Sequence, residues 1–102
     1  MSRVTAAQTR ARMEAAREDT AKGLLGWDKV ASKIGEAAGQ GHGQALFTPP
    51  AGVSIKATET AAELIEKLTA TGFRCDWRER RDAGDVLNHD LAVSWEGAAV
   101  QA

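Results

Sequence analysis

The sequence is poor in the residues that build covalent, metal-binding or aromatic sites. Its 102 residues include one cysteine, Cys75, and two prolines, and aromatic residues make up 5%. A single cysteine excludes an internal disulfide framework and any zinc site with several cysteine ligands. Because the first proline is Pro49, the chain before it contains no residue that forbids helix.

Neither sign of charge prevails, and long hydrophobic runs are missing. Thirteen basic residues against fourteen acidic ones leave a formal net charge of -1, so we expect no general attraction to nucleic acid or to a membrane surface. The apolar runs are too short for a membrane span. No apolar segment follows Met1, so we expect no secretory signal. The apolar content of 43% suits one small soluble domain.

An apolar stripe runs through the Ala-rich first part of the chain, at Met13, Ala16, Thr20, Leu24, Trp27, Ala31, Ile34 and Ala38. Steps of three and four residues keep these side chains on one helix face. Ser2 or Thr5 could cap the start. The pattern allows one long helix or two helices broken between Gly23 and Gly26, and the unbroken phase of the stripe favours one.

The two halves of this helical region differ in apolar content. Residues 27–38 carry enough apolar side chain to pack on a sheet, whereas residues 3–22 offer mostly alanine among charges. At about 25 cal/mol per Å² of buried apolar surface, the first half gains little from packing in a monomer. We therefore predict a helical extension over 1–26 that contacts a partner, an α+β core domain over 27–96 and a tail over 97–102.

The rest of the chain alternates between strand and helix patterns. Residues 44–48 form a short strand candidate that ends at Pro49. Thr58 or Thr60 opens a helix, since Thr60 and Glu63 have capping-box spacing. Its apolar face carries Ala61, Leu64, Ile65 and Leu68, and Gly72 ends it.

Two alternating segments predict an antiparallel hairpin. Phe73, Cys75 and Trp77 alternate with charged residues, and after a turn over 82–85 the segment 90–96 buries Leu91, Val93 and Trp95. The predicted fold is α+β, with a three-stranded antiparallel-type sheet, two helices on one face and a long N-terminal helix. We expect Trp27, Trp77 and Trp95 in the core, although tryptophan is also enriched at interfaces.

No motif of the sequence predicts a catalytic, cofactor-binding or metal-binding residue. The loop 39–43 follows a helix and precedes a strand, the reverse of a phosphate-binding loop. His42, His89 and Cys75 show no ligand spacing. Trp77 alternates away from the strand arginines, which argues against a nucleic-acid platform. The candidate partner interface consists of Met13, Ala16, Thr20, Leu24, Arg74, Arg78 and Arg80.

Three landmarks occur in order: Ile34–Gly41, Leu64–Phe73 and Leu91–Trp95. This arrangement resembles a loose group of small tailed-phage proteins, in which one helix ends in an Ile…Ala…Gly pattern, the next in Leu-x-x-x-Gly-aromatic, and the last strand in Ser-Trp. The resemblance covers about residues 27–96, and Phe73 and Val93 depart from the expected Tyr and Ile. It implies a virion or accessory component, with no catalytic residue to carry over.

The leading hypothesis is a non-enzymatic phage virion component, either a head decoration or a minor structural protein. It would need no cofactor, would be made in the host cytoplasm, and would self-associate or bind a larger virion protein. The alternative is a phage-encoded inhibitor of host defence that binds a host protein or sequesters a small nucleotide. Arg74, Arg78, His42 and the loop 39–43 are the candidate donors for that nucleotide.

Overall fold

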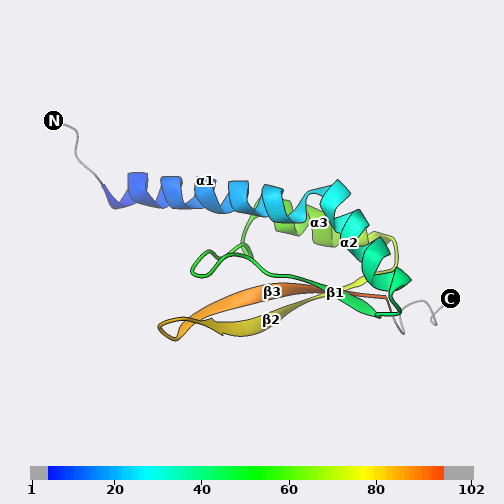
Figure 1. Cartoon of the computed structure of the whole chain (residues 1–102). Coiled ribbons are helices and arrows are strands. Elements are labelled where there is room, and N and C mark those ends of the chain that lie inside the picture. The colour runs from blue at the N-terminus through cyan, green and yellow to red at the C-terminus, as the bar shows by residue number, and fades with distance from the viewer. Residues whose placement is uncertain (1–4, 96–102) are drawn as a thin grey trace.

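The computed structural model describes residues 5–95, and these residues form three helices and three strands. The helices are α1 (Ala6–Leu25), α2 (Trp27–Gly39) and α3 (Glu59–Ala70), and the strands are β1 (Gln44–Phe47), β2 (Arg74–Asp82) and β3 (Val86–Ser94) (Figure 1). The α+β class, the three-stranded antiparallel sheet and the long first helix are confirmed. The predicted tail, 97–102, lies outside the described residues.

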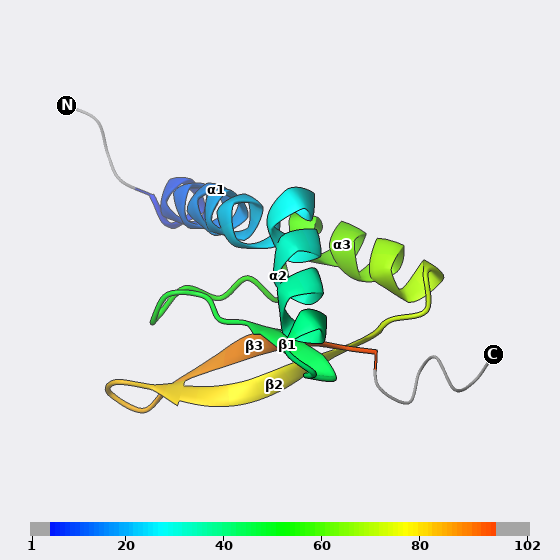
Figure 2. The same cartoon turned by 45° about the vertical axis from the view of Figure 1, so that its right-hand side comes forward.

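The sheet is antiparallel, with β3 between β1 and β2. Leu91 of β3 lies opposite both Phe47 of β1 and Trp77 of β2. The helices lie on one side of the sheet, and the β2–β3 turn extends in the same direction as the N-terminal half of α1 (Figures 1 and 2). β3 is central because both of its edges are paired, so its apolar side chains are the most completely enclosed.

The core gathers buried apolar side chains from all three helices, from β1 and β3 and from the loop before α3, while Cys75 and Trp77 of β2 pack against it half-buried. Its buried members are Ala21, Leu25, Val30, Ala45, Phe47, Ile55, Ala61, Leu64, Leu68, Leu91 and Val93. The predicted apolar faces of α3 and β3 therefore point inward, as the alternation and the helical spacing indicated. Ala21 and Leu25 belong to α1, so the C-terminal half of that helix is part of the folded domain.

The helical region breaks at Gly26, which lies between α1 and α2 with φ −57° and ψ 138°. This region therefore forms two helices, and the single helix favoured by the phase of the apolar stripe is wrong. A Cβ at Gly26 would lie 3.1 Å from the carbonyl oxygen of Lys22. The extended ψ turns the chain, so α2 contacts β1 while α1 contacts α3 (Figure 2).

Helix α3 begins at Thr58, one of the two predicted starts. The Thr58 hydroxyl accepts a hydrogen bond from the Ala61 amide at 3.2 Å and donates one to the Ile55 carbonyl at 2.6 Å. The predicted capping box between Thr60 and Glu63 is wrong, because the Thr60 hydroxyl donates to Glu18 of α1 instead. A residue far away in the sequence takes the role that local spacing assigned to Glu63.

The three tryptophans differ in burial. Trp77 and Trp95 are half-buried at the edge of the core, and the Trp95 ring meets Phe73 edge-to-face with centroids 6.3 Å apart. Trp27 is 44% exposed, and the Lys67 ammonium lies 4.5 Å from its ring centroid. The expectation of three core tryptophans is therefore wrong for Trp27, which covers the joint of α1 and α2 from outside.

Truncation of Phe47 should destabilise the protein more than truncation of Trp95. Phe47 is 1% exposed, so Phe47→Ala should lower the free energy of unfolding by about 3–5 kcal/mol. Trp95→Ala removes a half-buried ring and should cost less than that. Urea unfolding of both variants measures the order, and an equal or larger loss for Trp95→Ala would contradict this packing.

Cys75 should react slowly with thiol reagents in the folded protein. The side chain is half-buried beside the core, and burial raises the pKa of its thiol, so the reactive thiolate is scarce at neutral pH. Labelling with a chromogenic disulfide, with and without urea, gives the two rates. Equal rates in both conditions would mean that Cys75 faces solvent.

Candidate functional site

Helix α1 divides into a C-terminal half whose side chains enter the core and an N-terminal half whose side chains stay exposed. Ala21 and Leu25 are fully enclosed, and α1 contacts α3 along this half. Residues 6–16, here called the free half of α1, are exposed at every position. Figure 1 shows this half continuing beyond the end of α3. The free half is therefore the exposed part of α1.

Glu18 fixes α1 on the domain at the boundary between these halves. Its carboxylate accepts hydrogen bonds from the Thr60 hydroxyl at 2.8 Å, from the Thr60 amide at 3.4 Å and from the Glu59 amide. These amides belong to the first turn of α3, where the helix has unpaired N–H groups and the positive end of its dipole. The hydrogen bonds, led by that of Thr60, lower the pKa of Glu18.

A local cap holds the other end of α1. The Thr5 hydroxyl accepts a hydrogen bond from the Gln8 amide at 3.1 Å, and the Gln8 side chain accepts one from the Thr5 amide at 3.4 Å. This reciprocal pair is a capping box, and it confirms Thr5 as one of the two predicted caps. The free half thus begins at a satisfied helix end.

The predicted interface residues of α1 occupy different environments. Met13 is 40% exposed and Ala16 is exposed, so both are available to a partner. Thr20 is half-buried, and Leu24 packs against the core. The part of the predicted interface that lies in the free half is therefore Met13 and Ala16.

The arginines of β2 lie on the sheet face away from the helices, yet they are not equally available. Arg74 is exposed. Arg78 is exposed and donates a hydrogen bond to the Gln44 side chain at 2.9 Å. Arg80 is half-buried, pairs with Asp82 and Asp90, and donates to the Pro49 carbonyl at 3.1 Å. Arg80 thus has its donors directed at its own domain.

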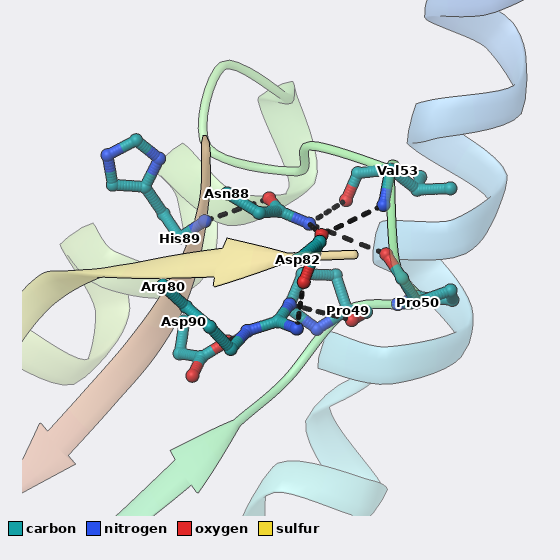
Figure 3. Close-up of polar contacts among 9 residues, drawn as sticks. Pro49, Pro50, Val53, Arg80, Asp82, Asn88, His89 and Asp90 are labelled. Carbon is teal, nitrogen blue, oxygen red and sulfur yellow. Dashed lines mark hydrogen bonds and ion pairs between the residues drawn. The ribbon is translucent and has the colours of Figure 1, made fainter. Parts of the chain in front are cut away.

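Arg80 belongs to a polar network that ties the loop after β1 to the β2–β3 hairpin (Figure 3). The Asn88 amide donates to the carbonyls of Pro50 and Val53 at 3.4 and 3.2 Å and to Asp82 at 3.2 Å. Asp82 also accepts from the Gly52 amide at 2.9 Å. Its side chain is only 3% exposed, and these bonds, led by that of Gly52, lower its pKa.

Glu18, Asp82 and Asn88 are the positioning residues that sequence reasoning missed. Glu18 bonds residues 41 and 42 positions away, and Asn88 bonds carbonyls 35 and 38 positions away. Local sequence patterns do not predict such partners for a charged residue on a helix surface or for an asparagine in a strand. The signal for these roles lies only in the tertiary contacts.

The histidines and the glycine-rich loop do not assemble a reactive cluster in the part of the chain that the structure describes. Among residues 5–95, no three His, Cys, Asp or Glu side chains are arranged to hold a metal ion. His42 and Gly43 line an open pocket with Gln44, Leu46 and Ser94. Within the same range, no helix combines the length and the apolarity that crossing a bilayer requires.

The chain has no match in any of three comparisons: neither a protein-family model, nor a curated protein, nor a solved structure corresponds to it.

Acid should destabilise the protein through Glu18 and Asp82. Both carboxylates have a folded-state pKa below the ordinary values of 4.5 and 3.8. Their contribution is present above those values and is lost as pH falls through the lower folded-state pKa values. Urea unfolding between neutral and strongly acid pH should show this loss, and Glu18→Gln and Asp82→Asn should each reduce the pH dependence.

The matched control is Glu66→Gln, which neutralises an exposed carboxylate of α3. It should leave the pH dependence close to that of the unchanged protein. A Glu18→Gln variant with the same acid sensitivity as the Glu66→Gln variant would contradict the anchoring role of Glu18.

Proposed function

We propose that the protein is a non-enzymatic assembly component that binds another protein chain through the free half of α1. The observation that carries the proposal is a regular, capped helix whose residues 6–16 are all exposed. Isolated helices of this length are marginal in water and gain most of their stability from packing. A partner that covers the free half would supply the contacts that the rest of the chain does not.

The anchoring of α1 supports this role. Glu18, Ala21 and Leu25 hold the C-terminal half on the domain, so the free half projects in a defined direction. A helix presented in this way can be covered by a partner without rearrangement of the core. The free half presents to a partner an alanine-rich surface, on which Met13 is the largest apolar side chain. Arg10, Arg12 and Glu14 flank this surface.

The context we propose is the virion of a tailed phage, as a head decoration or a minor structural protein. This step rests on the resemblance of residues 27–96 to small tailed-phage proteins. A weak contact per copy suits such a role, because many copies arranged on a lattice gain attachment from multivalency.

Ala16→Asp should reduce the amount of this protein in purified virions of the phage that encodes it. An aspartate at the C-terminal end of the free half puts a charge where the partner helix or groove would approach. Quantitative mass spectrometry of purified particles measures copies per virion. Ala31→Asp is the matched control, since Ala31 is an exposed helical alanine of α2, and it should leave incorporation unchanged.

Two results would overturn parts of this proposal. Complete absence of the unchanged protein from purified particles would reject the virion role. Equal incorporation of the Ala16→Asp and Ala31→Asp variants would reject the free half as the attachment surface.

A second candidate function is sequestration of a small nucleotide by a host-defence inhibitor. The observation that favours it is the open pocket of His42, Gly43, Gln44 and Ser94, beside which Arg78 bonds Gln44. Calorimetric titration with nucleoside monophosphates and cyclic dinucleotides tests it. Binding that is lost in Arg78→Ala supports this function, and no binding of either ligand class to the unchanged protein rejects it.

A further inference from the structure

We infer that α1 pairs with α1 of a second copy of this chain in antiparallel orientation. The inference rests on the proposed function and names the partner of the free half. Thr9, Met13, Ala16 and Thr20 follow one another at steps of four, three and four, so they form one line along the helix, here called the α1 seam. The first three are exposed and Thr20 is half-buried, so the seam is open to a neighbour.

The small side chains of the seam permit a close approach, and Met13 supplies its apolar bulk. In an antiparallel pair related by a two-fold axis between positions 14 and 15, Met13 of each copy lies level with Ala16 of the other. Thr9 then lies level with Thr20. Each Met13 side chain therefore packs against the Ala16 of the other copy. This pairing of a large with a small side chain is the complementarity that helix packing requires.

Charge complementarity selects the antiparallel orientation. Arg12 and Asp19 are seven residues apart, so they lie on the same side of the seam, and both are exposed. Two-fold symmetry brings Arg12 of each copy near Asp19 of the other and forms two reciprocal ion pairs. A parallel in-register pair would instead place Arg12 of each copy near Arg17 of the other, which are like charges.

Both charges are available for this contact. Among residues 5–95, neither Arg12 nor Asp19 forms an ion pair. On the other side of the seam, the positive charges of Arg10 and Arg17 approach each other across the pair. Glu14 lies four residues after Arg10 and three before Arg17. Its negative charge therefore lies beside both arginines in each helix and reduces their repulsion across the pair.

The domains leave room for the pair. Glu18, Ala21 and Leu25 face the domain, and the helical spacing puts Thr9 and Ala16 on another side of α1. Met13, at the edge of the seam, also lines a groove between α1 and Ser54–Glu59 of its own chain. Because the helices run in opposite directions, the two domains sit at opposite ends of the pair. Two helices of about 30 Å bury less than the roughly 1,600 Å² of a standard interface. We therefore expect micromolar or weaker association, which repeated copies on a particle would reinforce.

Sedimentation equilibrium of the full chain, from about 10 µM to about 1 mM, tests the pairing. The unchanged protein should form a dimer in this range. Arg12→Asp and Asp19→Arg should each weaken the dimer by about tenfold, and the double variant should restore it because the reciprocal pairs reform with reversed sign. Ala16→Asp should abolish the dimer.

Ala11→Asp is the matched control. Ala11 is an exposed alanine of the same free half on the opposite face of α1, so this variant should dimerise like the unchanged protein. Circular dichroism of every variant verifies that α1 remains helical. Failure of the double variant to restore the dimer, or equal dimerisation of Ala16→Asp and Ala11→Asp, would overturn the proposed pairing.

The outcomes separate this inference from the proposed function. A chain that stays monomeric to 1 mM, yet loses virion incorporation with Ala16→Asp, would place a different protein on the free half and reject only the pairing. A dimer sensitive to Ala16→Asp in a chain absent from virions would keep the pairing and reject the virion role.

Discussion

The carboxylate of Glu18 at the first turn of α3 fixes the geometry on which the external surface of this protein depends. It bonds the Glu59 and Thr60 amides and the Thr60 hydroxyl, groups that a helix N-terminus otherwise leaves unpaired. With Ala21 and Leu25 buried beside it, α1 has one defined direction relative to the sheet. Without that anchor, a helix of alanines and charges would have little to orient it.

The same anchor divides α1 by function. Residues after Glu18 contribute side chains to the core, whereas residues 6–16 contribute none. The free half is nevertheless capped at Thr5, so it is built as a helix from its first turn. Apart from Met13, its apolar side chains are alanines, which bury little surface on packing. The proposed partner chain would supply the packing that the free half lacks in a single copy.

The loop after β1 is secured by polar contacts with the β2–β3 hairpin. Asp82 and Asn88 hold the loop after β1 through Gly52, Pro50 and Val53 (Figure 3). The loop backbone thereby finds partners that secondary structure does not provide. Arg80 completes the network through Asp82, Asp90 and Pro49. An arginine that resembles a binding residue in the sequence thus stabilises the fold.

The sequence by itself determined the elements whose cause is local. Helical spacing of Ala61, Leu64 and Leu68 placed the inner face of α3, and alternation placed Leu91 and Val93 inside the sheet. Tertiary structure alone decided the break at Gly26, the use of Thr60 by Glu18 and the inward role of Arg80. The physical reason is range: periodicity reports which face of an element is apolar, whereas a single hydrogen-bonding or charged side chain takes whichever partner the folded chain brings near it.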